Sequence, residues 1–155
     1  MFQRIIKTPI GPLLLEVDKN QLVKIDFLTS YSFKYDKHPL LDETELQLSE
    51  YFNGQRYQFD LAISFAGTLF QQEVWSALQT IPYGESCSYQ VIAKKINRDK
   101  AVRAVGQANR RNPLPIVIPC HRVVGKNGSM TGYAGTQIDK KEFLLSLEKN
   151  HYSNA

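Results

Sequence analysis

The chain has 155 residues, of which 43% are hydrophobic and 22% are charged, a composition that is ordinary for a globular protein. This length supports one hydrophobic core or two small packed domains. Lysine, proline and glycine residues interrupt the beginning of the chain before an apolar run can form, so neither a signal peptide nor a membrane span is expected. The net charge of +4 is mild and by itself indicates no particular partner.

Cysteine and histidine are scarce, with 2 and 3 residues respectively. No CxxC or HxxxH spacing occurs, which argues against a structural zinc site, and we expect neither a metal nor a cofactor. The missing signal peptide favours a cytoplasmic protein, in which Cys87 and Cys120 stay reduced. We expect Cys87 to be a buried free thiol.

The N-terminal part, residues 1–66, is predicted to be a small α+β scaffold domain. Three short apolar segments predict a meander of strands: residues 4–8, 13–18 and 22–27. Residues 42–55 predict a helix, because apolar side chains recur at helical spacing and an Asn-Gly pair follows them. Residues 57–61 alternate between apolar and polar, as an edge strand does.

Three helices are predicted next. The first begins at Thr68, which can form a capping box with Gln71. The second covers residues 88–96, with Ser88 as its cap. The third covers residues 100–111 and follows after a short polar turn, so that the last two helices predict a helix-turn-helix.

Positive charge is concentrated around this third helix. Residues 94–111 contain seven Lys or Arg and one Asp, a local charge of +6 that exceeds the charge of the whole chain. Helical spacing gives the segment two sides. The apolar side consists of Ala101, Val105 and Ala108, and the polar side of Arg103, Gln107, Arg110 and Arg111. The polar side is either a solvated helix surface or a surface that contacts phosphates.

The segment "IPCHRVV", residues 118–124, places Cys120 between a proline and a histidine. A cysteine beside a histidine is either a nucleophile beside its base or a small buried residue beside a surface one. The short β-branched run at residues 116–118 predicts a buried strand that Pro119 ends. The glycine-rich residues 125–135 then predict a loop that can fold over the cysteine.

The last predicted helix begins with Asp139 as its cap. Helical spacing predicts that it presents Phe143, Leu144 and Leu147 to the core, with Glu148 near that face.

Four motifs together resemble the O6-alkylguanine–DNA alkyltransferases, also called methylated-DNA–protein-cysteine methyltransferases. They are "GTLFQQEVWSALQTIPYGESCSY", "AVRAVGQANRRNP", "IPCHRVVGKNGSMTGYAG" and "KEFLLSLE", which cover residues 67–148 almost without a gap. The block "PCHRV", at its distance from "RAVG" and "NP", is the most specific part. The resemblance implies an α+β protein, with a ribonuclease-H-like domain at residues 1–66. A mostly helical, winged-helix-like domain with the helix-turn-helix would form residues 67–155.

The resemblance assigns the chemistry to five residues. Cys120 corresponds to the alkyl acceptor, His121 to the base that deprotonates it through a water, and Glu148 to the carboxylate that orients the histidine. Asn112 corresponds to the hinge between the DNA-binding helix and the active-site loop. Tyr89 corresponds to the tyrosine that contacts the flipped nucleotide and donates a proton or hydrogen bond to the leaving guanine.

The resemblance also implies contacts with the DNA. Arg103 would enter the base stack and fill the gap that the flipped guanine leaves, while the remaining polar side of the helix holds phosphates. Around the base we expect the backbone carbonyls of Cys120 and Val123, the N–H of Ala134, Pro115 as a wall and Lys141 at the pocket edge. Arg122 is expected to form a structural salt bridge.

The function that the resemblance implies is direct-reversal DNA repair. The lesion would be flipped out of the duplex and its alkyl group transferred irreversibly to Cys120, so that each molecule acts once. The implied partner is double-stranded DNA that contains O6-alkylguanine, with O4-alkylthymine as a second candidate lesion. We expect a monomer that does not bind membranes.

Two alternative functions stay open. A cysteine hydrolase would use Cys120, His121 and Glu148, and it would turn over. A catalytically inert helix-turn-helix binder would flag alkylation damage or regulate transcription, and it would transfer no label to the protein.

Overall fold

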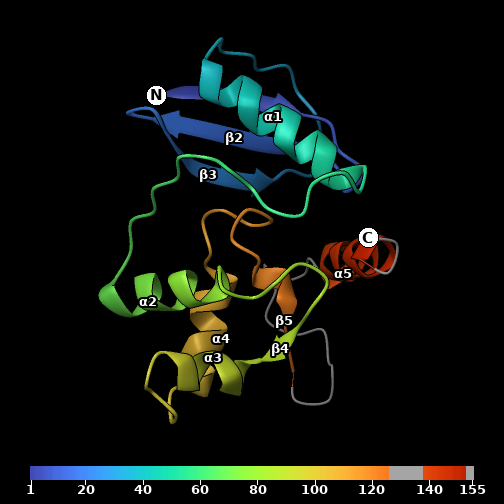
Figure 1. The fold of residues 1–155 in the computed structure, drawn as a ribbon. Coiled ribbons are helices and arrows are strands. Elements are labelled where there is room, and N and C mark those ends of the chain that lie inside the picture. The colour runs from blue at the N-terminus through green and yellow to red at the C-terminus, as the bar shows by residue number, and fades with distance from the viewer. Residues whose placement is uncertain (126–137, 153–155) are drawn as a thin grey trace. The chain divides into compact units, whose positions relative to one another are not determined.

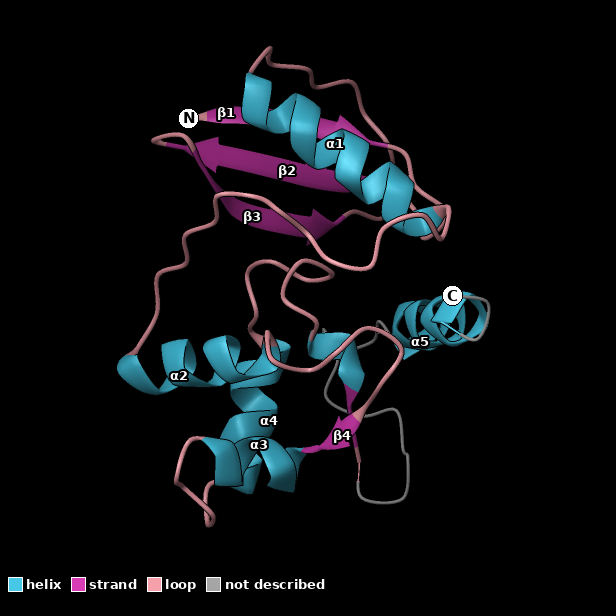
Figure 2. Cartoon of the chain, in the orientation of Figure 1, coloured by secondary structure: helices cyan, strands magenta, loops and turns pink. Residues whose placement is uncertain are grey.

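A computed structural model describes residues 1–125 and 138–152. It divides into two compact units, Met1–Phe65 and Ala66–Ala155. Helices and short sheets occur together, so the predicted α+β class is confirmed (Figures 1 and 2). Within the described residues, no helix has both the length and the apolar character that crossing a bilayer requires.

The N-terminal unit contains the predicted meander. Strands β1 (Phe2–Ile6), β2 (Leu13–Asp18) and β3 (Gln21–Phe27) pair antiparallel in that order. Alternate residues of β2, among them Leu13 and Leu15, are fully buried. Helix α1 (Pro39–Phe52) lies across the sheet and buries Leu48 and Tyr51 (Figure 1). This unit therefore has a core of its own.

Two details of this unit differ from the prediction. Helix α1 begins three residues earlier than expected, because the His38 side chain accepts from the Leu40 N–H and Pro39 suits the first turn. Residues 57–61 form no strand, so that prediction was wrong. The backbone of Asp60 pairs with the Gln47 side chain and not with a strand. The Asp60 N–H donates to Oε1 of Gln47 at 2.9 Å, and Nε2 of Gln47 donates to the Asp60 carbonyl at 3.0 Å.

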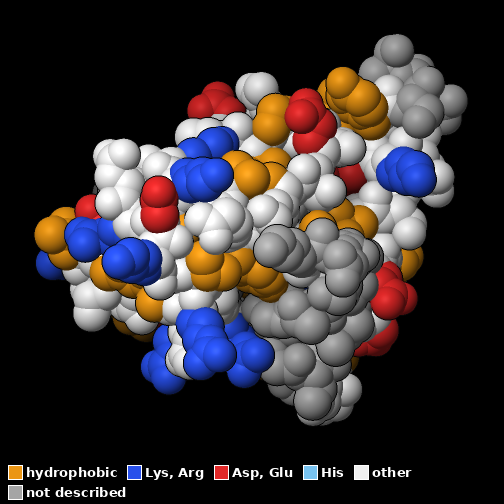
Figure 3. Space-filling view, turned by 90° about the horizontal axis from the view of Figure 1, so that it is seen from below, with side chains coloured by type: hydrophobic (Ala, Val, Ile, Leu, Met, Phe, Trp, Pro, Cys, Tyr) orange, Lys and Arg blue, Asp and Glu red, His pale blue; other side chains and the backbone are white. Residues whose placement is uncertain are grey.

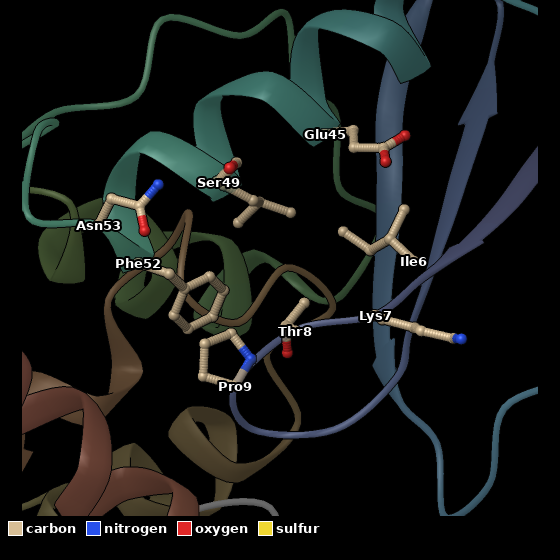
Figure 4. Close-up of a pocket in the computed structure, with 9 residues that line it drawn as sticks. Ile6, Lys7, Thr8, Pro9, Glu45, Ser49, Phe52 and Asn53 are labelled. Carbon is tan, nitrogen blue, oxygen red and sulfur yellow. The ribbon is translucent and has the colours of Figure 1, made fainter.

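The N-terminal unit also holds a small pocket of about 180 Å³. Figure 4 shows that its walls come from α1 and from the segment at the end of β1, with Pro9 beside Phe52 and the Lys7 side chain directed away. The buried Arg4 lies on β1 and forms ion pairs with Asp42 and Glu45. These carboxylates are held by a structural arginine, in keeping with a scaffold.

The second unit contains the remaining elements. Its helices are α2 (Leu69–Leu78), α3 (Tyr89–Lys95), α4 (Val102–Arg110), the short 3₁₀ helix η1 (Cys120–Arg122) and α5 (Ile138–Tyr152). Strands β4 (Cys87–Ser88) and β5 (Val123–Val124) pair in parallel. The capping box of Thr68 and Gln71 and the Ser88 cap are confirmed. Helices α2, α3 and α4 pack together, and α3 and α4 form the predicted helix-turn-helix (Figure 1).

Two predictions in this unit were wrong. Residues 116–118 form a turn and not a strand, because the Ile118 N–H donates to the Leu114 carbonyl and Ile116 adopts a φ of 76°. On α5, Phe143 is 39% exposed, although Leu144 on the same helix is buried as expected. Lys141 and Glu148 occupy the buried side of α5 instead, so a polar cluster replaces part of the apolar contact.

Candidate active site and DNA-binding helix

Cys120 is the first residue of η1, and only 2% of it is exposed. The parallel pairing of β4 with β5 brings Ser88 beside Val124, so Tyr89 begins α3 close to the strand that follows the cysteine. From α4, the Asn109 side chain donates to the Cys120 carbonyl at 3.3 Å. The cysteine is therefore held between α4 and the small parallel sheet.

His121, Arg122 and Glu148 form a buried cluster directly beside the cysteine. Nε2 of His121 lies 2.5 Å from Oε2 of Glu148, and both side chains are at most 1% exposed. Arg122 donates to both oxygens of Glu148, at 2.8 and 3.0 Å, and to the Ile81 carbonyl at 2.7 Å. The Gly84 N–H donates to Oε1 of Glu148 at 3.2 Å. These hydrogen bonds engage both oxygens of the carboxylate.

The charge state of Glu148 determines which nitrogen of His121 carries the hydrogen. The pKa of Glu148 lies far below its ordinary value: burial alone would raise it, but the hydrogen bonds and charges of His121 and Arg122 outweigh burial. An ionised carboxylate only accepts, so the hydrogen of His121 must be on Nε2. Its Nδ1 is buried and has no hydrogen-bond partner among the described residues. Burial also lowers the pKa of His121, against the attraction of Glu148, so the neutral imidazole predominates near pH 7.

The side chains of Lys141 on α5 and Tyr89 on α3 lie close to each other. The Lys141 side chain is buried, and burial lowers its pKa to about 8, with an opposing charge interaction from Cys120. Its Nζ lies 5.9 Å from the centre of the Tyr89 ring. That ring lies beside Gly106 of α4, where an added Cβ would meet it at an ordinary 3.9 Å. The positive charge of a lysine near Cys120 favours the thiolate form of the cysteine.

Helix α4 has the two sides that the sequence predicts. Val105 and Ala108 are buried, whereas the predicted polar side is exposed. Three residues of this polar side, Arg103, Gln107 and Arg111, line a hollow of about 410 Å³ together with the first turn of α2. Lys and Arg side chains gather on the face that Figure 3 presents. Part of the positive charge is already paired, because Arg98 forms an ion pair with Glu73.

Asn112 and Pro115 lie in the segment between α4 and the cysteine. The Asn112 side chain donates to the Ile118 carbonyl at 2.8 Å and accepts from the Leu114 N–H at 2.9 Å. It thereby ties the end of α4 to the residues that lead into Cys120. Pro115 is buried and forms a bridge with Ile118.

The structure brings most of the expected site residues into one unit. Cys120, His121 and Glu148 cluster, and the expected salt bridge of Arg122 is confirmed. Cys87 is a free thiol but only half-buried, and burial raises its pKa. Ala134 lies outside the described residues, so its expected contact with the base stays a prediction.

Sequence reasoning missed two residues at the site, Asn109 and Gly84. Asn109 follows Val105 by four positions and so belongs to the inward side of α4. A polar residue on a buried helix side indicates a buried hydrogen bond. Gly84 adopts a φ of +81°, and its "PYG" context is typical of a turn. Nothing local to Gly84 indicates that its N–H reaches Glu148, 64 residues away.

Comparison with known protein families matches both units. Residues 1–65 match the ribonuclease-like domain of 6-O-methylguanine DNA methyltransferase. Residues 69–150 match the DNA-binding domain of the same family. The two matches together span nearly the whole chain.

Individual relatives and solved structures agree with these matches. The constitutive methylated-DNA–protein-cysteine methyltransferase of Bacillus subtilis (strain 168) is 46% identical over 155 residues, covering 94% of each chain. A methylated-DNA–protein-cysteine methyltransferase of Methanosarcina barkeri is 45% identical, covering 97% of this chain and 99% of that protein. The crystal structure of Mycobacterium tuberculosis OGT in complex with DNA is 44% identical, covers 97% of this chain and 94% of that one, and superposes with a TM-score of 0.88. The chain therefore belongs to the 6-O-methylguanine–DNA methyltransferase family.

Proposed function

We propose that this protein repairs O6-alkylguanine in duplex DNA by transferring the alkyl group to Sγ of its own Cys120, once per molecule. The observation that carries the proposal is the buried, unpartnered Nδ1 of His121 next to Cys120 in the chain. Glu148 holds the hydrogen of His121 on the other nitrogen, so Nδ1 is available to accept a proton. A base next to the thiol, oriented by a third group behind the base, is the arrangement that activates a thiol.

The proposed chemistry is one displacement. His121 takes the proton of the Cys120 thiol through a water, and the thiolate attacks the alkyl carbon. The S–C bond forms as the C–O6 bond breaks, and the electron pair of the broken bond stays on the guanine. Tyr89 donates a hydrogen bond or proton to the leaving guanine. The thioether that results is not an acyl group, so water does not readily release it and the protein is consumed.

The proposed DNA interface is the exposed side of α4. Gln107, Arg110 and Arg111 contact the backbone, and Arg103 fills the space that the flipped guanine leaves. Support comes from the exposure of these side chains and from the hollow that three of them line. Asn112 links this helix to the cysteine segment through its bond to Ile118.

The proposal extends to the residues around the flipped base, to the oligomeric state and to the cellular compartment. Pro115 walls the base pocket, Val123 supplies a backbone carbonyl and Lys141 borders the nucleophile. The protein acts as a monomer in the cytoplasm, where Cys120 stays reduced. Its lesions are O6-alkylguanine and, as a further candidate, O4-alkylthymine.

The test is intact-mass spectrometry after incubation with a duplex that contains O6-methylguanine. One added methyl mass on Cys120, without turnover, supports the proposal, and Cys120→Ala should bind DNA but accept no methyl group. Continuous release of methanol would identify a hydrolase. A wild-type protein that binds the duplex but gains no mass would identify an inert binder, and a label on Cys87 would also contradict the proposal.

A further inference from the structure

Asn109 is a buried polar residue on the inward side of α4, which it shares with the apolar residues Val105 and Ala108. Only 1% of Asn109 is exposed, so its side chain has no direct access to a bound duplex. Its Nδ2 donates to the carbonyl oxygen of Cys120 at 3.3 Å. The helix that carries the proposed DNA contacts is therefore hydrogen-bonded to the main chain of the nucleophile.

Fold stability does not explain why this position holds an asparagine. Its Oδ1 is buried and has no hydrogen-bond partner among residues 1–125 and 138–152. The two amide atoms cannot be exchanged, because Oδ1 would then face the carbonyl oxygen of Cys120. A leucine of similar size would remove the unpaired acceptor, and the Cys120 carbonyl would keep the Val123 N–H as its donor. The hydrogen bond to Cys120 is therefore better explained by a role in the reaction.

The turn of α4 that contains Asn109 is itself anchored in the core. Nε1 of Trp75 on α2 donates to the carbonyl oxygen of Ala108 at 2.8 Å, and only 2% of Trp75 is exposed. Two consecutive residues of α4 are thus bonded in opposite senses: Ala108 accepts from α2, and Asn109 donates to η1. A movement of this turn is therefore passed on to the backbone of Cys120.

We infer that Asn109 is a positioning residue that fixes Cys120 relative to α4 and so relative to the DNA that α4 holds, an inference that rests on the proposed function. A flipped lesion stays covalently attached to the DNA backbone. Its alkyl carbon therefore meets Sγ of Cys120 only if α4 and the cysteine keep the correct separation. A free alkylated base has no such attachment and can adjust to the cysteine. Positioning matters at this scale, because a displacement of about 1 Å can slow a reaction about 100-fold.

The experiment measures single-turnover methyl transfer from an O6-methylguanine duplex and from the free base O6-methylguanine, for the wild type and for Asn109→Leu. With the duplex, Asn109→Leu should react about tenfold more slowly, whereas with the free base it should stay within about twofold of the wild type. Iodoacetamide labelling of Cys120 is a second reaction without attachment to DNA and should show the same small change. Affinity for the duplex, measured in the Cys120→Ala background, should not change. A merely structural role would slow all three reactions alike.

Trp75→Phe is the matched control, because it removes a second buried hydrogen bond of the same helix turn and leaves Asn109 in place. It should lower the unfolding temperature and keep the wild-type ratio of the duplex rate to the free-base rate. Asn109→Leu should unfold at or above the wild-type temperature, because it removes a buried unpaired acceptor. Asn109→Ala replaces it if the leucine prevents folding, and it should change the ratio in the same direction.

Three outcomes overturn the inference while the proposed function stands. Asn109→Leu could keep the wild-type rate on the duplex, it could slow the duplex and the untethered reactions equally, or Trp75→Phe could change the ratio as much as Asn109→Leu does. If the wild type transfers no methyl group from the duplex, the proposed function fails together with the inference.

Discussion

Arg122 donates to both oxygens of Glu148, with Nε 2.8 Å from Oε1 and Nη2 3.0 Å from Oε2. The guanidinium and the carboxylate therefore neutralise each other inside the protein. His121 is bonded to the same carboxylate but is not needed as its counter-charge. This explains how a histidine next to a buried carboxylate can be neutral and still be oriented by it.

Removing Arg122 should damage the fold more than the loss of one surface charge. Arg122→Met leaves Glu148 buried without its cation, a change that typically costs about 3–5 kcal/mol. Urea unfolding at pH 7 measures this loss. Arg122→Lys should lower the stability less, because it keeps the positive charge and loses only the bidentate hydrogen bonding to Glu148. Wild-type stability in Arg122→Met would show that Glu148 is not ionised.

The pH dependence should show that His121 is the base. Because burial lowers its pKa below the ordinary 6.5, the single-turnover rate should fall as the pH decreases through the region below 6.5. His121→Gln should slow transfer far more than it weakens binding to the lesion. Rates measured with excess protein separate chemistry from binding. A variant with the wild-type rate and pH profile would exclude His121 as the base.

Stability should also decrease in acid, for the same groups. The folded-state pKa values of His121 and Glu148 both lie below their ordinary values of 6.5 and 4.5. The unfolded chain therefore binds more protons, so the stability that is present above pH 6.5 is lost progressively as the pH falls. Urea unfolding at several pH values measures this, and the first part of the loss should be missing in His121→Gln.

Lys141 should stabilise the reactive thiolate at the expense of the fold. Its folded-state pKa of about 8 lies below the ordinary 10.5, so stability should increase as the pH rises between these values. Lys141→Met should be at least as stable as the wild type at pH 7. Its Cys120 should react more slowly with iodoacetamide, because the nearby cation is gone. Unchanged Cys120 reactivity would mean that Lys141 only fills space.

Gly84 should not tolerate a side chain. Its φ is +81°, and a Cβ would lie 2.6 Å from the Tyr152 ring on α5. Gly84→Ala should therefore lower the unfolding temperature and slow transfer, because the N–H that bonds Glu148 must move. Adding Tyr152→Ala removes the clash but not the strained φ, so it should restore only part of the stability. Full restoration would show that the backbone conformation contributes nothing.

The arginines of α4 should differ in their roles. Arg110→Ala and Arg111→Ala should weaken binding to any duplex and reduce the slope of log affinity against log salt by up to about one per phosphate contact. Arg103→Ala should slow repair in duplex DNA and affect a free alkylated base less. Lys24→Ala on β3 is the charge-matched control. Equal losses on both substrates in all three variants would exclude the base-stack role of Arg103.

Local sequence signals predicted the elements whose stabilising contacts are local. The Thr68–Gln71 capping box and the Ser88 cap connect residues three apart, so the sequence alone predicts them. The two sides of α4 follow from helical spacing alone. The "PCHRV" block and its companion motifs indicated the family, because a specific chemistry requires those residue types at those distances.

Only the tertiary structure decided the features that depend on distant partners. Glu148 reaches His121 across 27 residues and Gly84 across 64, and no periodicity encodes such a meeting. Residues 116–118 have the composition of a strand, but without a neighbouring strand their backbone turns and bonds to Leu114. Asn109 is an ordinary polar residue in the sequence, and only folding buries it against Cys120, where its side-chain amide donates to the Cys120 carbonyl. A buried polar group needs a partner, and the fold determines which groups are buried.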